Sequence, residues 1–153
     1  MPARIASFLS AVTCWGLLLG TQTFASAAAD APLRIESRLV WGSNTESVPE
    51  GVSAKPVDEK LNKRLRGMFK WRHYHEVEHK VIELAHKKSQ KVQFGKDCAV
   101  KVTYLGNNQI EAVYGEGDSQ VRKRQTLKPG EIFSIGGPRK NDSAWFAIFS
   151  LAH

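Results

Sequence analysis

The sequence predicts a mainly β fold, an antiparallel β-sandwich or small barrel of about seven to nine strands with one N-terminal helix. Two observations support this prediction. After Phe69, short runs rich in β-branched and aromatic residues are separated by turn signals built from Gly, Pro, Asn and Asp. Only the segment from Pro56 to Phe69 carries the apolar spacing of a helix. Because strands and helices do not alternate along the chain, we do not expect a parallel α/β sheet.

The N-terminus has the features of a secretory signal peptide. Arg4 precedes the apolar run IASFLSAVTCWGLLLG, which leads to the small residues ASAAA. The apolar run is shorter than the about 20 residues that a transmembrane helix needs, so cleavage after Ala27 is favoured over a membrane anchor. Residues 1–27 are therefore predicted to be a signal peptide, and we expect an exported protein, periplasmic or extracellular, with no transmembrane span after cleavage.

The mature chain is expected to form one domain. Residues 28–56 contain a strand, LRIESRLVWG, and a surface loop rich in Ser, Gly and Pro, while residues 57–153 contain the helix and the sandwich. Cys98 is then the only cysteine, so no internal disulfide can form. In the alternating run CAVKVTYL it shares a face with Val100 and Val102, which predicts a core position and not a catalytic one.

The helix has one apolar face and a basic remainder. Val57, Leu61, Leu65 and Met68 recur at helical spacing, which favours packing on the sheet over binding to a membrane surface. The rest of the helix and the next residues supply cations and aromatic rings. The predicted binding surface consists of Lys60, Lys63, Arg64, Arg66, Lys70 and Arg72, with Trp71 and Tyr74 as aromatic contacts.

The charge of the chain points to an anionic partner. The formal net charge is +7, and between Lys60 and Lys101 twelve basic residues face four acidic ones. Such a local surplus is typical of proteins that bind anions, although a well-charged soluble surface would also produce it. The expected partner is an anionic envelope polymer, a lipid head group or another envelope protein, not nucleic acid. Binding of this kind should weaken as salt is added.

The segment KWRHYHEVEHK raises the alternative of a metal site. In a regular strand His73, His75 and His79 would share one face. The side chains of His73 and His75 would lie about 6.6 Å apart, close enough to share an ion, whereas His79 would lie roughly 13 Å beyond His75 unless the chain bulges. A zinc or copper site built on His73 and His75 is therefore an alternative hypothesis, and it needs a further ligand from another strand.

The runs FKWRHYHEVEHKVIEL, VQFGKDCAVKV and NDSAWFAIFSL resemble small exported bacterial single-domain β proteins of unknown function. The resemblance implies a β domain and no particular activity. Neither a nucleophile motif nor an acid–base pair is recognisable in the sequence. The sequence therefore favours a non-enzymatic binding or cell-envelope structural module without a cofactor. Metal binding by His73 and His75 is the first alternative, and a hydrolase of envelope polymer is the second.

Overall fold

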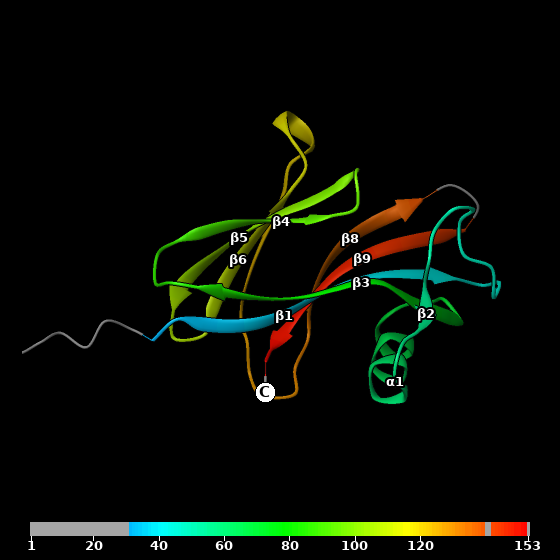
Figure 1. The fold of residues 1–153 in the computed structure, drawn as a ribbon, viewed down its shortest axis with the longest axis horizontal. Helices are drawn as coiled ribbons and strands as arrows, with labels where there is room; N and C mark the ends of the chain where they lie inside the picture. The colour runs from blue at the N-terminus through cyan, green and yellow to red at the C-terminus, as the bar shows by residue number, and fades with distance from the viewer. Residues whose placement is uncertain (1–30, 140–141, 153) are drawn as a thin grey trace, which may run out of the picture.

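The described residues, 31–139 and 142–152 of the computed structural model, form nine strands and one α-helix (Figure 1). The predicted signal peptide lies outside them. The elements are β1 Leu33–Ser43, β2 Lys55–Pro56, α1 Glu59–Met68, β3 His73–Leu84, β4 Ser89–Phe94, β5 Cys98–Gly106, β6 Gln109–Tyr114, a 3-10 turn Gly117–Ser119, β7 Val121–Thr126, β8 Phe133–Arg139 and β9 Ser143–Leu151.

The strands form two antiparallel sheets, which confirms the predicted sandwich. The larger sheet has the order β2-β3-β1-β9-β8, and the smaller sheet has the order β4-β5-β6-β7. Within the larger sheet β9 lies between β1 and β8, and its residues from Ser143 to Phe149 are all buried. An interior strand covered on both faces is what the continuous apolar run SAWFAIFSL predicts.

The main core lies between the two sheets. In β5, Cys98, Val100, Val102 and Tyr104 all point inward, as their alternation predicts, and Cys98 is 7% exposed. Facing them from the larger sheet are apolar residues of β1, β3, β8 and β9, including Phe149, which is fully buried. Cys98 therefore occupies a core position in the structure.

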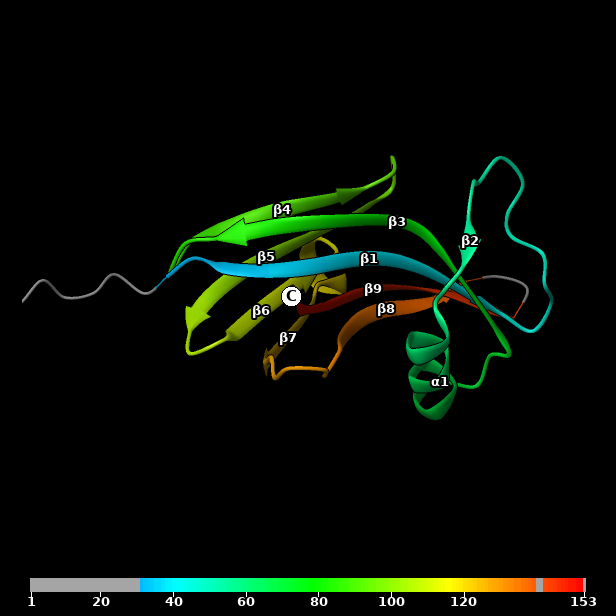
Figure 2. The ribbon, with the colours of Figure 1, turned by 60° about the horizontal axis from the view of Figure 1, so that its bottom comes forward.

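A second, smaller core lies between α1 and the opposite face of the larger sheet. Leu61 and Leu65 of the helix pack there against Phe146 and other apolar residues of β1, β3 and β9. Met68 was expected on the same face, but it is 52% exposed because the helix ends at this residue. Phe69 takes its place, with its ring stacked on that of Phe146 at 4.3 Å. Figures 1 and 2 show α1 and the β5–β6 turn at opposite ends of the molecule.

A β-bulge interrupts β3. Its register with β1 shifts at Leu39–Val40, which leaves Val77 as an extra residue on β3. An extra residue reverses the alternation of side chains beyond it. Tyr74 consequently packs under α1, while Ile82, although an even number of residues away, packs between the sheets. The bulge also decides where the histidines point.

The loop between β7 and β8 turns back toward α1. The sequence KPGE predicts a turn with Gly130 at positive φ, and Gly130 has φ 78°. The N–H of Glu131 donates to the carbonyl of Lys128 at 3.0 Å, which closes this turn. Of the helices in the described ranges, none has the length and apolarity to cross a membrane.

Candidate functional site

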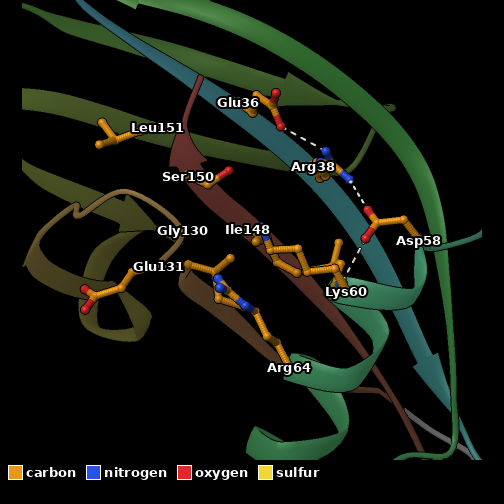
Figure 3. A pocket seen from close by; sticks show the side chains of 12 residues that line it. Glu36, Arg38, Asp58, Lys60, Arg64, Gly130, Glu131, Ile148, Ser150 and Leu151 are labelled. Atoms are coloured by element: carbon orange, nitrogen blue, oxygen red, sulfur yellow. Dashed lines mark hydrogen bonds and ion pairs between the residues drawn. The ribbon is translucent and has the colours of Figure 1, made fainter. Parts of the chain in front are cut away.

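A hollow of about 200 Å³ lies where α1, the sheet and the β7–β8 loop meet (Figure 3). One wall is the exposed side of α1, another is formed by β1 and β9, and the third is the loop around Gly130. We call it the α1 hollow. Its lining residues are Glu36, Arg38, Asp58, Lys60, Leu61, Arg64, Gly130, Glu131, Ile132, Ile148, Ser150 and Leu151.

Arg38 organises the charges at one end of the α1 hollow. Its guanidinium lies 2.9 Å from Glu36, 3.2 Å from Asp58 and 3.2 Å from Glu76. Glu76 is 6% exposed and also pairs with Lys55 at 3.2 Å. We call Arg38 with these three carboxylates the Arg38 cluster. It ties the start of α1 to β1 and β3, because Asp58 is the N-cap residue of the helix.

The pKa values of the cluster follow from these contacts. The pKa of Asp58 is lowered, first by the hydrogen bond that its carboxylate accepts from the Leu61 N–H at 2.8 Å and then by Arg38. Burial by itself would lower the pKa of Arg38, but the hydrogen bond to Glu36 and the charges of Glu76 and Glu36 raise it. Both groups therefore stay charged throughout the neutral range.

Of the cations that the sequence assigned to the helix, Lys60 and Arg64 line the α1 hollow, whereas Lys63 and Arg66 do not. Lys60, Lys63 and Arg66 are exposed and Arg64 is half-buried. None of these four makes an ion pair within the described part of the chain. Figure 3 shows Arg64 extending from α1 toward the loop at Gly130, with the carboxylate of Glu131 turned away from the hollow.

A second hollow continues along α1 from the first. It has a volume of about 460 Å³ and is lined by Lys63, Arg64, Gly67, Met68, Gln125, Gly130, Glu131 and Ile132. The two hollows share Arg64 and the residues from Gly130 to Ile132. Together they form a groove between the helix and the β7–β8 loop, with cations along its helical side.

The remaining residues of the predicted surface are placed differently. The ammonium of Lys70 pairs with Asp142 at 2.7 Å, so its charge is already balanced. Arg72 is exposed, without an ion pair among the described residues. Trp71 is half-buried against Phe146, with ring centroids 5.4 Å apart, and its indole N–H donates to the carbonyl of Asp142.

Tyr74 requires a correction, because its ring does not reach the surface. It is 3% exposed and its hydroxyl donates to the carbonyl of Leu65 at 3.2 Å. Burial raises its pKa. The physical reason is that α1 lies directly over this part of β3, so Tyr74 anchors the helix and contributes nothing to a surface contact. The aromatic part of the predicted surface reduces to Trp71.

The three histidines do not share one face. His73 and His75 pair with β1 before the bulge, and His75 lies opposite Trp41, which packs toward the core between the sheets. His79 lies beyond the bulge opposite Arg38, with its Nε2 3.8 Å from Glu36 on the helical side. The extra residue in β3 is the reason, and the expectation of a row of three histidines was wrong.

His73 and His75 line a separate hollow of about 350 Å³ together with Glu46, Arg72 and other residues of β2 and α1. The Nδ1 atom of His75 is buried and has no hydrogen-bond partner among the described residues. Across the same residues no three His, Cys, Asp or Glu side chains gather closely enough to hold a metal ion. Within the described ranges, no third protein ligand of the kind that a zinc site needs lies beside these two histidines.

Sequence reasoning missed Glu36, Arg38 and Ser150, which come from strands and not from the helix. One signal was present. In IESRLV the charged residues Glu36 and Arg38 occupy the face of β1 that must also be covered, since β1 is an interior strand. Charges at such positions are paired in folded proteins. The partner, however, lies 20 residues away at Asp58, so the pairing becomes visible only in the fold.

Comparisons with known proteins give no relative for this chain. No protein-family model matches it, and neither the curated proteins nor the solved structures include a match. The resemblance to small exported β proteins stays a prediction.

Proposed function

We propose that this protein is a non-enzymatic binding module that holds an extended anionic polymer of the cell envelope along α1. The polymer lies in the groove between the helix and the β7–β8 loop. Lys60, Lys63 and Arg64 line this groove and attract the negative groups of the polymer, and the exposed Arg66 and Arg72 add positive charge outside it. The predicted export to the periplasm or the extracellular space would bring the protein to where such polymers occur.

The observation that carries this proposal is an imbalance in ion pairing. The carboxylates of Glu36, Asp58 and Glu76, next to the helix, already form ion pairs with Arg38. The helix cations have no such partners within the described ranges. Their positive charge is therefore left for a partner from solution, and several exposed cations in a row attract a polyanion more strongly than a single small anion.

A polymer is favoured over a lipid head group because the apolar face of α1 is already used. A helix that binds a membrane buries its apolar side chains between the lipids. Here Leu61 and Leu65 are buried against the sheet. Among the described residues, the large apolar side chains that remain exposed are Met68, Val81 and Val121, which belong to α1, β3 and β7.

The experiment compares binding of the purified protein to polygalacturonate and to its fully methyl-esterified form, which has the same backbone without the charge. Affinity electrophoresis through gels containing either polymer measures the interaction. We expect only the acid form to retard the protein. The triple variant Lys60→Gln, Lys63→Gln, Arg66→Gln should bind the acid form with about tenfold lower affinity and be retarded less.

The matched control is the triple variant Lys88→Gln, Lys91→Gln, Lys101→Gln. It removes the same amount of charge from three exposed lysines, of which Lys91 and Lys101 lie on β4 and β5 of the smaller sheet and Lys88 directly precedes β4. These lysines also lack ion pairs among the described residues. We expect this variant to bind nearly as well as the unmodified protein. Equal losses in both variants would mean that only net charge matters, and the helix surface would not be the binding site.

A further inference from the structure

We infer that the α1 hollow is a subsite for one uronic acid unit, a sugar ring that carries a carboxylate. This inference rests on the proposed function and makes it more specific, since it selects acidic polysaccharide among the anionic polymers. It follows from the size of the hollow and from the kinds of polar groups that surround it.

The size fits a single sugar ring. The α1 hollow, with a volume of about 200 Å³, has room for many times the space that one water molecule needs. One six-membered ring with its substituents can therefore enter it. Neighbouring units of a polymer would continue into the adjoining hollow beside Lys63 and Met68.

Two cations of the α1 hollow, Lys60 and Arg64, lie apart from the Arg38 cluster in having no carboxylate partner among the described residues. Both come from α1. They provide the donors for a ligand carboxylate, which a guanidinium can bind through two parallel hydrogen bonds. Glu36 and Asp58 lie at the end of the hollow near Arg38 (Figure 3).

This arrangement discriminates against simple anions. Glu36 and Asp58, although paired with Arg38, keep acceptor oxygens, and a phosphate diester or a sulfate ester has no donor to offer them. A sugar hydroxyl is a donor and is attracted to the same carboxylates, and the hydroxyl of Ser150 can donate or accept next to them. A ligand that satisfies both sides must therefore carry a negative group and several hydroxyl groups.

The remaining lining is aliphatic. Leu61, Ile132, Ile148 and Leu151 form it, coming from α1, the β7–β8 loop and β9. The carbon-bound hydrogens of a sugar ring give it an apolar face that can cover such side chains. A compact inorganic anion has no surface of this kind, which again favours a sugar ring as the occupant.

The test uses four probes. They are trigalacturonate, the uncharged trisaccharide galactotriose, inorganic triphosphate and long-chain polyphosphate. Isothermal titration calorimetry gives their affinities for the unmodified protein and for Ser150→Trp, which fills the hollow without changing any charge. We expect trigalacturonate to bind more tightly than either other probe. The substitution should weaken trigalacturonate by about tenfold and change long-chain polyphosphate by less than about twofold.

A second measurement needs no variant. Amide chemical shifts of ¹⁵N-labelled protein should move at Gly130 and Ile148 when trigalacturonate is added. The inference is overturned if triphosphate binds as tightly as trigalacturonate, or if these two signals stay in place at saturation. Polyphosphate binding that persists in either case leaves the proposed function intact. Failure of every polyanion to bind at low salt would remove both.

Discussion

Replacing Arg38 by methionine should destabilise the whole domain, because Arg38 is the cation that three carboxylates share. Methionine keeps much of the volume and removes the charge. Among the described residues, Glu76, which is 6% exposed, would keep Lys55 as its one cationic partner, and the side chain of Lys55 is 75% exposed. Removing one partner from a buried ion pair costs about 3–5 kcal/mol, whereas an exposed pair contributes about 0–1 kcal/mol.

The Arg38 cluster lies between these limits, since the side chain of Arg38 is 21% exposed and that of Asp58 is 56% exposed. We therefore expect Arg38→Met to lower the free energy of unfolding by about 2–4 kcal/mol. Urea denaturation followed by tryptophan fluorescence measures this, with an unchanged m value as the sign that only stability has changed.

The same strand provides a matched control. Arg34 pairs with Glu83 at 3.1 Å, but both side chains are more than half exposed, so Arg34→Met should cost at most about 1 kcal/mol. Adding Glu76→Gln to Arg38→Met should restore part of the loss, because the uncompensated buried charge is then removed. Equal losses in the Arg34 and Arg38 variants, or no recovery in the double variant, would refute the reasoning.

Three further predictions concern stability. Asp58→Ala should cost about 1 kcal/mol in urea denaturation through loss of the helix cap, and Asp58→Asn clearly less, since asparagine also caps helices; equal costs would contradict this. The pKa of Glu111 is lowered, chiefly by the hydrogen bond from Arg124, so its contribution to stability is present above an unfolded pKa of about 4.3 and is lost as the pH falls. Glu111→Gln should therefore flatten the loss of stability measured below about pH 5, and an unchanged acid limb would refute it. A Cβ at Gly136 would overlap the carbonyl oxygen of Trp145 on β9, whereas a Cβ at Gly137 would meet nothing within 4 Å. Thermal unfolding should therefore show a cost of about 3 kcal/mol for Gly136→Ala and almost none for Gly137→Ala. Similar unfolding midpoints for the two variants would contradict this.

The fold could be predicted from local patterns because most of its contacts repeat them. The alternation of Cys98, Val100 and Val102 gave the inner face of β5, and the turn at Gly130 followed from its sequence. The β-bulge at Val77 could not be predicted in this way. This bulge adds one residue to β3 with no Gly or Pro beside it in the sequence, and it reverses the side chains beyond it.

The same distinction between local patterns and contacts made only in the fold applies to the candidate site. The helix cations were predictable because helical periodicity separates them from Leu61 and Leu65. The Arg38 cluster was not, because its members come from β1, β3 and the start of α1, which meet only in the fold. Tyr74 was misplaced for the same reason, since its neighbour Leu65 lies on a different element.

The most direct test of the central claim is the salt dependence of polygalacturonate binding. The affinity of the unmodified protein should fall steeply between low salt and about 0.3 M. Exposed charges are screened by salt, and the Debye length is already as short as about 10 Å at 0.1 M. The triple variant Lys60→Gln, Lys63→Gln, Arg66→Gln should bind more weakly at low salt and show a clearly flatter dependence. The same steep dependence in both proteins would contradict the account and would place the polymer elsewhere on the molecule.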